Sequence, residues 1–257
     1  MISERLLHFP EMPKHGRTAA TTGRRSKTDD GGVIVIPNKM KESHAKPPVD
    51  EAGLCLANPC RVMLIGGCGA SKTTVLQSML ARGAMWLPWE HIYLMAPTPD
   101  VATGEYPDIT TTFLEKFPPL EYFKDRPGRS ALVLDDVHLH DLSTKGNPSQ
   151  QELCNRICGH LSTHHNPGGL SVFIANQVWT AVPPSIRKLM SHYVLFPQRI
   201  ARDSIGHIAR GVLMTKRELE ACCDMCTGVY DFLLITNEPD GRARVRINGT
   251  EPVHGIH

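Results

Sequence analysis

A glycine-rich segment with a single lysine, residues 66–74, separates an apolar run from a stretch with helical spacing. The apolar run at 61–65 predicts a buried strand, and residues 72–82 predict a helix. Small residues between a strand and a helix let backbone N–H groups curl inward as a nest for an anion. The N-terminal end of the following helix adds a favourable dipole. The segment therefore predicts a phosphate-binding loop.

The P-loop pattern is Gly, four residues, Gly, Lys, and then Ser or Thr. Gly66, Lys72 and Thr73 fall in register, whereas Ser71 replaces the second glycine and adopts positive φ less readily. Lys72 is expected to reach the β- and γ-phosphates of ATP, and the Thr73 hydroxyl to coordinate Mg²⁺. A glycine-rich turn with an incidental lysine is the simpler alternative. The predicted nucleotide-binding residues are Gly66, Gly67, Cys68, Gly69, Ala70, Ser71, Lys72, Thr73 and Thr74.

Two other apolar runs end in polar side chains. The run at 131–134 leads into Asp135 and Asp136, and the run at 171–175 leads into Asn176 and Gln177. Ligands of open α/β sheets bind at the carboxyl ends of the strands, so these side chains are expected beside the phosphate loop. We assign Asp135 to Mg²⁺, Asp136 to the attacking water, and Gln177 to the γ-phosphate or the water. Polar strand ends that only open loops are the alternative.

Short apolar runs alternate with helical patterns from about residue 51 onwards. Further strands are expected at 91–95 and 192–195, and helices at 148–161, 183–190 and 215–223. Segments 230–235 and 243–247 suggest a hairpin, and Thr215 with Glu218 has capping-box spacing. The alternation predicts an α/β fold, namely a P-loop NTPase with a mainly parallel, doubly wound sheet and a C-terminal hairpin.

The N-terminal residues 1–50 differ from the rest in composition. Residues 14–46 are rich in Gly, Pro, Ser, Thr and charge, and bury too little to offset their ordering entropy. We therefore expect a disordered basic arm at 1–50 and a P-loop ATPase domain at 51–257. Its basic cluster suits either a solvated tail or a nuclear-import or nucleic-acid contact. The cluster consists of Arg17, Arg24, Arg25 and Lys27.

The net charge and the cysteine content exclude few classes of protein. A net charge of +2 neither demands nor excludes a nucleic-acid partner. The absence of a signal-like start or an apolar run of membrane length predicts a soluble, intracellular protein with reduced thiols. Some of the cysteines and histidines could hold Zn²⁺ or simply pack in the core, and their spacings match no standard zinc finger. They are Cys154, Cys158, His160, His164, His165, Cys222, Cys223 and Cys226.

The three polar motifs, in this order, resemble those of viral genome-packaging ATPases in the poxvirus-type branch of the FtsK–HerA superfamily. The likeness spans about 61–196 and continues more faintly to 247. Residues 132–136 resemble the family's Walker B segment, and 164–177 resemble the segment that leads into its sensor glutamine. Residues 186–187 and 191–196 resemble the part after that glutamine, and 230–235 the late strand. Asp136 stands where many relatives carry Glu.

The resemblance implies an additional-strand P-loop fold, a homo-oligomeric ring, and ATP-driven translocation of double-stranded DNA into a capsid. It also implies a capsid or portal partner, no membrane, and a location in the host-cell nucleus, a viral factory or the virion. An arginine that completes the neighbouring subunit's site is expected, with Arg187, Arg199 and Arg202 as candidates. The alternatives are a nucleotide or nucleoside kinase, which shares the P-loop, and a nucleotide-binding scaffold without turnover.

Overall fold

The computed structural model describes the chain in several segments, which together carry the phosphate loop and the two polar strand ends. They are residues 59–81, 89–97, 110–119, 121–124, 129–139, 149–159, 169–237, 241–249 and 251–253. The predicted arm at 1–50, with its basic cluster, lies outside the described residues. None of the helices in the described segments is long and apolar enough to cross a lipid bilayer.

A mixed sheet of nine described strands forms the centre of the fold. Its strands lie in the order β3-β2-β4-β5-β1-β6-β7-β8-β9. In chain order the strands are β1 (Arg61–Ile65), β2 (His91–Met95), β3 (Thr110–Phe113), β4 (Ser130–Asp135), β5 (Leu170–Asn176), β6 (His192–Leu195), β7 (Leu233–Asn237), β8 (Ala243–Ile247) and β9 (Glu251–Pro252).

The pairing of the strands changes from parallel to antiparallel at β6. All neighbours from β3 to β6 are parallel, whereas β6, β7, β8 and β9 pair antiparallel. Strand β5 lies between β1, which precedes the glycine-rich loop, and β4, which ends in Asp135. This inserted strand confirms the additional-strand arrangement that the resemblance implied. The antiparallel pair β7–β8 confirms the C-terminal hairpin.

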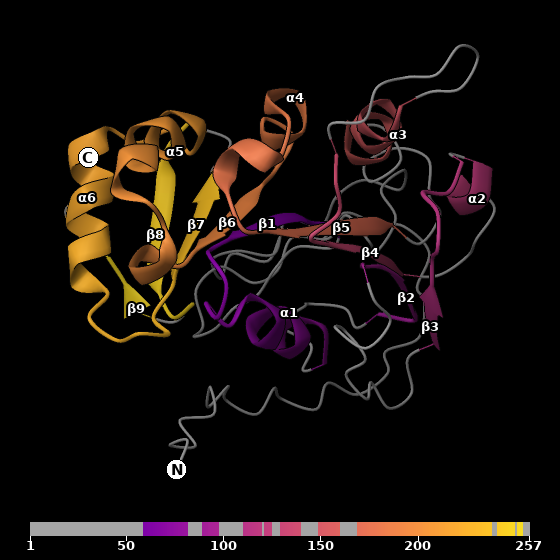
Figure 1. The fold of residues 1–257 in the computed structure, drawn as a ribbon, viewed down its shortest axis with the longest axis horizontal. Coiled ribbons are helices and arrows are strands. Elements are labelled where there is room, and N and C mark those ends of the chain that lie inside the picture. Colours follow the sequence, from indigo (N-terminus) through magenta and orange to yellow (C-terminus); the bar gives the residue numbers. More distant parts are fainter. Residues whose placement is uncertain are drawn as a thin grey trace, which may run out of the picture.

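Helices cover both faces of the sheet (Figure 1). Helix α1 (Lys72–Ala81) lies on one face, and α3 (Gln150–Arg156), α4 (Pro184–Arg187) and α5 (Ile205–Gly211) lie on the other. Helix α6 (Lys216–Met225) packs against α5 at the β8 end, and α2 (Glu121–Lys124) lies near β3 at the opposite end. Strands covered on both faces are apolar on both, which is why β1, β4 and β5 read as unbroken apolar runs.

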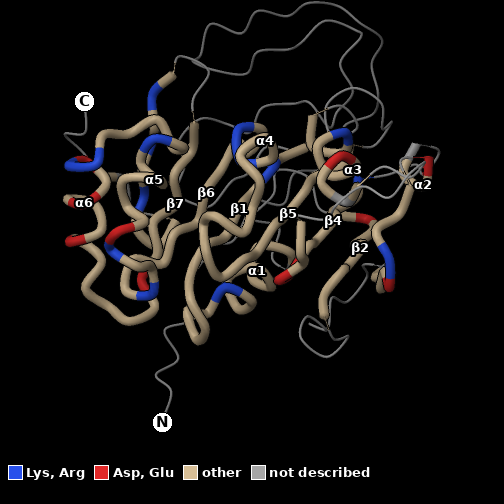
Figure 2. Tube along the Cα trace, turned by 45° about the horizontal axis from the view of Figure 1, so that its top comes forward, with Lys and Arg blue, Asp and Glu red and all other residues tan. Residues whose placement is uncertain are grey.

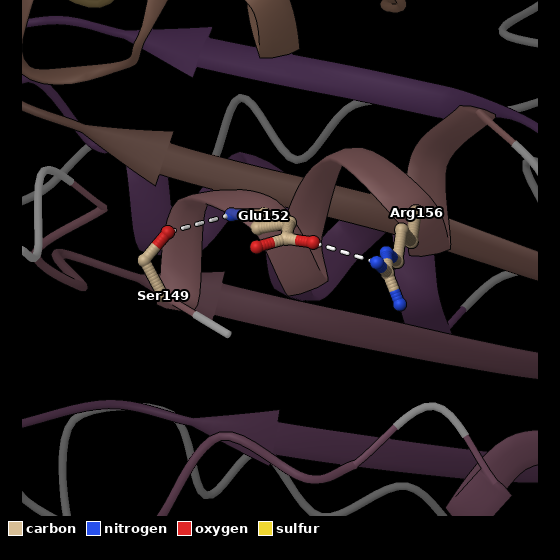
Figure 3. Close-up of polar contacts among 3 residues, drawn as sticks. All are labelled: Ser149, Glu152 and Arg156. Carbon is tan, nitrogen blue, oxygen red and sulfur yellow. Dashed lines mark hydrogen bonds and ion pairs between the residues drawn. The ribbon is translucent and has the colours of Figure 1, made fainter. Parts of the chain in front are cut away.

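Side-chain caps fix the starts of two helices. In α3 the Ser149 hydroxyl accepts a hydrogen bond from the Glu152 N–H at 3.1 Å, and Glu152 pairs with Arg156 one turn later (Figure 3). In α6 the Thr215 hydroxyl accepts from the Glu218 N–H, while the Glu218 carboxylate accepts from the Thr215 N–H. The predicted capping box is confirmed. Of the helix predicted at 148–161, residues 148, 160 and 161 lie outside the described part.

Several boundaries differ from those expected. Strand β7 begins at Leu233 rather than at residue 230, because Gly228–Asp231 forms a turn in which the Asp231 N–H donates to the Gly228 carbonyl. Helix α4 ends at Arg187 rather than at residue 190. The elements that were not anticipated include α2, β9, α5, which contains two glycines, and β3, which begins with three threonines. Glycine disfavours helices, and a polar run lacks the apolar signal of a buried strand.

Acid is expected to destabilise the fold through His192. This side chain is 8 % exposed on β6, and burial, with a smaller effect of Arg61, lowers its pKa from 6.5 to about 4. Between those pH values the unfolded chain binds a proton that the folded chain does not. The free energy of unfolding should therefore fall by about 3 kcal/mol as the pH drops through this window. Urea unfolding of wild type and His192→Gln at pH 7 and pH 4.5 checks this, and an equal fall in both would contradict it.

Candidate nucleotide-binding site

The predicted phosphate loop joins the carboxyl end of β1 to α1, and its first two residues anchor it. The Gly66 N–H donates to the Asn176 carbonyl at 3.3 Å, and the Gly67 N–H donates to the Arg199 carbonyl at 2.8 Å. A Cβ atom at Gly66 would lie 2.9 Å from the Cβ atoms of both Ala70 and Phe196. Only glycine fits this position, so the loop is held between the ends of β5 and β6.

Lys72 lies inside the loop rather than in solvent. Its side chain is 8 % exposed, and its Nζ donates to the carbonyl of Gly66 at 2.7 Å and to that of Gly67 at 3.3 Å. The ammonium group therefore lies over the start of the loop, at the N-terminal end of α1. A cation at a helix N-terminus, bonded among the described residues to neutral carbonyls, creates a strongly anion-attracting position.

Ser71 occupies a position that favours glycine. Its φ is +67°, in the left-handed region, as is that of Gly69 at +71°. This conformation costs an L-residue about 1 kcal/mol or more, which explains why the common pattern has glycine here. The backbone nevertheless completes the loop, because the Ser71 carbonyl accepts the Val75 N–H at 3.0 Å. The serine is tolerated at the expense of local strain.

The Ser71→Gly variant is therefore expected to be more stable than wild type by about 1 kcal/mol, because glycine adopts positive φ without strain. Ser78→Gly is the matched control, since Ser78 lies inside α1, where replacing serine with glycine costs about 0.5 kcal/mol. Urea unfolding of both variants measures the two effects. A loss of stability in Ser71→Gly would show that the strain is absent or that the hydroxyl compensates for it.

The register of the sheet brings the acidic strand end beside the loop. Asp135 pairs with Ala175, and Ile65 pairs with Asn176, so β4, β5 and β1 end at one edge. Asp135 is 2 % exposed, and its Oδ2 atom has no hydrogen-bond partner among the described residues. Burial and the neighbouring Asp136 raise the pKa of Asp135, while Lys72 lowers it.

A buried carboxylate oxygen without a partner is costly unless a donor or a cation joins it. Carboxylate and hydroxyl oxygens are the ligands that Mg²⁺ prefers. Asp135, with its free oxygen, and the half-buried Thr73 at the start of α1 therefore fit the expected magnesium ion. Their assignment as metal ligands stays a prediction.

Asp136 and Gln177 meet in front of this edge. The Gln177 Nε2 atom donates to the Asp136 Oδ2 at 3.1 Å, and both side chains are exposed. Asp136 has a φ of +48°, and its N–H donates to the Ala175 carbonyl at 2.9 Å, so the turn after β4 is fixed. Asn176 is buried, and its Oδ1 accepts the Gln177 N–H at 2.9 Å. Asn176 therefore shapes the strand end, whereas Gln177 reaches the open side.

The three candidate arginines lie in different surroundings. The Arg187 guanidinium lies 5.0 Å from the centre of the Trp179 ring and is half-buried, and burial lowers its pKa. Arg199 is exposed. Its backbone carbonyl accepts the Gly67 N–H, which places the residue beside the phosphate loop of its own chain. Arg202 is exposed at the start of the turn Arg202–Ser204. Basic and acidic residues are interspersed along the described chain (Figure 2), in keeping with the small net charge.

Two supports of the loop have no counterpart among the motifs that the sequence predicts. Phe196 limits Gly66 to glycine, and the Arg199 backbone holds Gly67. The sequence offered one indication of these two contacts, namely that both residues closely follow a strand that ends at the same edge of the sheet.

In the possible zinc cluster, Cys154 and Cys158 are buried with their sulfur atoms 3.9 Å apart. The described residues include no group of three or more potential metal ligands, and His160, His164 and His165 lie outside them.

Comparison with known proteins supports the fold. No protein-family model and no curated protein match this sequence. The DNA-packaging ATPase B204 from Sulfolobus Turreted Icosahedral Virus matches with a TM-score of 0.51 and 13 % identity, over 76 % of this chain and 98 % of that chain. B204 from Sulfolobus turreted icosahedral virus 2, in complex with ATP-gammaS, has a TM-score of 0.47 and 13 % identity over the same shares. The first match confirms a P-loop ATPase fold, as the resemblance implied.

Proposed function

We propose that this chain is an ATP-hydrolysing motor that translocates double-stranded DNA into a viral capsid. The observation that carries the proposal is the convergence of Lys72, Asp135 and the Asp136–Gln177 pair at one sheet edge. A phosphate site next to a hydrogen-bonded carboxylate and amide is suited to the attack of water on a γ-phosphate. The fold shared with the DNA-packaging ATPase B204 supports packaging as the work that hydrolysis drives.

Binding would begin with the phosphates. Lys72 now donates to two loop carbonyls, so a small rotation of its side chain exchanges them for β- and γ-phosphate oxygens. This exchange replaces neutral acceptors with charged ones, which strengthens each hydrogen bond. The dipole of α1 favours the same negative charge. The loop thereby orients the terminal phosphate towards the ends of β4 and β5.

The magnesium ion that accompanies ATP would be held by the Thr73 hydroxyl and the Asp135 carboxylate. When bound, it supplies charge neutralisation on the phosphate oxygens. Asp135 is suited to this role because its Oδ2 is buried and has no hydrogen-bond partner among the described residues, so a cation would satisfy it. Its neighbour Asp136 points to the exposed side, which separates the metal-holding carboxylate from the water-facing one.

The attacking water would be positioned by Asp136 and Gln177. The Gln177 amide donates to one oxygen of Asp136, which leaves the other oxygen to accept a hydrogen bond from the water. The amide carbonyl of Gln177 offers a second acceptor. Asp136 is one methylene shorter than the Glu of many relatives. The hydrogen bond from Gln177 would therefore set the position of its carboxylate relative to the water.

A homo-oligomeric ring would complete each site with an arginine from the neighbouring subunit. Arg199 and Arg202 suit this role best among the three candidates, because both are exposed and lie on the turns that follow β6. Arg187 stacks on Trp179 and is engaged within the chain, whereas only the backbone carbonyl of Arg199 contacts the loop and its side chain is exposed. A capsid or portal protein, and action in the host-cell nucleus or a viral factory, belong to the same proposal.

Steady-state ATP hydrolysis with and without linear double-stranded DNA tests this function. We expect DNA to raise the rate of an assembled oligomer, because a motor couples turnover to its track. The Lys72→Ala variant supplies the background rate. A rate that does not change with DNA would contradict the motor. Transfer of phosphate to an added nucleoside monophosphate, in place of water, would instead support a kinase.

A further inference from the structure

Three exposed apolar side chains gather on the segment around residues 225–230, which links α6 to β7. Met225, Val229 and Tyr230 are 51 %, 53 % and 63 % exposed. Single exposed apolar residues are ordinary, whereas a group of them marks a binding surface. The nucleotide site described above does not use this group.

Hydrogen bonds tie this segment to the phosphate loop. The Gln198 Nε2 donates to the Cys226 carbonyl at 2.7 Å, and the rings of Phe196 and Phe232 lie 5.8 Å apart. Gln198 belongs to the turn Pro197–Arg199, whose last carbonyl accepts the Gly67 N–H. Leu233, the first residue of β7, pairs with Leu195, the last of β6. The segment therefore lies at the same edge of the sheet as the loop.

The turn that carries Val229 and Tyr230 is rigid. The Asp231 carboxylate accepts hydrogen bonds from the Gly228 N–H at 2.7 Å and from the Asn248 side-chain amide at 3.0 Å. The Asp231 N–H also donates to the Gly228 carbonyl. Both ends of the turn are thus fixed, and its two central side chains project outward. A surface fixed in this way loses little conformational entropy when a ligand binds.

The direction of the nucleotide follows from the catalytic residues. Asp135, Asp136 and Gln177 lie at the ends of β4 and β5, on one side of β1, so the γ-phosphate faces that side. The other end of the nucleotide must extend to the opposite side, over β6 and β7. Two strand spacings place the start of β7 about 10 Å from β1. That distance is comparable with the separation between the β-phosphate and the base in an extended nucleoside triphosphate.

We propose that Tyr230, flanked by Val229, forms the platform on which the purine base of the nucleotide stacks. The inference rests on the proposed nucleotide site and adds the part that a phosphate loop lacks, which is a contact for the base. An aromatic face stacks on a base through dispersion and ring electrostatics, and the phenol hydroxyl stays in solvent. The exposed ring, the fixed turn and the direction of the phosphates all favour this occupant.

Calorimetric affinities for Mg²⁺-ATP and for Mg²⁺ with inorganic tripolyphosphate test the platform. Tyr230→Ala should bind ATP about tenfold more weakly than wild type and bind tripolyphosphate equally well, because the second ligand has no base. Tyr230→Phe keeps the ring and should retain the wild-type affinity for both ligands. Leu213→Ala is the control, since Leu213 is 54 % exposed between α5 and α6. The Leu213→Ala variant should bind both ligands with the wild-type affinity.

Equal ATP affinities of Tyr230→Ala and wild type would overturn the inference and leave the nucleotide site standing. Equal weakening of both ligands would also overturn it, because the substitution would then have disturbed the phosphate loop. A wild-type protein that binds neither ligand would refute the nucleotide site itself, and the base platform with it. The comparison of the two ligands therefore separates the two failures.

Discussion

Replacing Lys72 with alanine is expected to lower kcat/KM for ATP at least about 100-fold, the loss typical of removing one preorganised charge-stabilising donor. The Lys72 ammonium is the buried cation of the loop, with its Nζ 2.7 Å from the Gly66 carbonyl. Its removal deprives the phosphates of a charge-assisted hydrogen bond and removes the group that lowers the pKa of Asp135. Both changes oppose binding of a Mg²⁺-nucleotide. Steady-state phosphate release measures the effect.

Lys188→Ala is the matched control for Lys72→Ala. Lys188 is exposed at the C-terminal end of α4, away from the loop, so its loss changes the net charge by the same amount. The control should keep the wild-type kcat/KM. Near-wild-type hydrolysis in Lys72→Ala would mean that the glycine-rich loop is not the phosphate site.

Replacing Gly211 with alanine is expected to destabilise the protein by about 2–3 kcal/mol. A Cβ atom there would lie 2.3 Å from Cζ2 of Trp179, far inside van der Waals contact. The indole is 3 % exposed and is held by the Tyr193 ring at 5.8 Å and the Arg187 guanidinium at 5.0 Å. The ring cannot move aside without displacing both neighbours. The free energy of unfolding in urea gives the change directly.

Gly206→Ala is the matched control in the same helix. A Cβ atom at this position would meet only the flexible end of Lys216, at 3.8 Å, which is ordinary contact. Alanine favours the helix over glycine by up to about 1 kcal/mol, so Gly206→Ala should be as stable as wild type or more stable. If Gly211→Ala and Gly206→Ala had the same free energy of unfolding, the packing of Trp179 on α5 would be refuted.

The parts of the fold that the sequence predicts are those with a local signal. Unbroken apolar runs identify β1, β4 and β5 because strands covered on both faces need apolar side chains on both. The capping-box spacing of Thr215 and Glu218 identifies the start of α6. Helix α5 has no such local signal. Its Gly211, which disfavours a helix, leaves room for the indole of Trp179, and that contact is with a residue remote in the sequence.

In the candidate site, too, the sequence predicts some features and leaves others to the folded structure. The identity and order of its side chains follow from the loop spacing and from the polar ends of β4 and β5. Their alignment depends on strand register, which pairs Asp135 with Ala175 and Ile65 with Asn176. The Arg199 carbonyl that anchors Gly67 is a backbone group, so no side-chain pattern could reveal it. Tyr230 was expected in a strand and lies in a turn, because Asp231 binds Gly228.

The Asp136→Asn variant tests the proposed hydrolysis of ATP by water that Asp136 positions. Asparagine preserves the shape of the side chain but removes the charge that accepts a proton from water. We would measure ATP affinity and single-turnover hydrolysis in wild type and variant. We expect Asp136→Asn to bind ATP with the wild-type affinity and to turn it over at least about 100-fold more slowly. Full turnover in Asp136→Asn, or no turnover in wild type at concentrations that favour assembly, would contradict it.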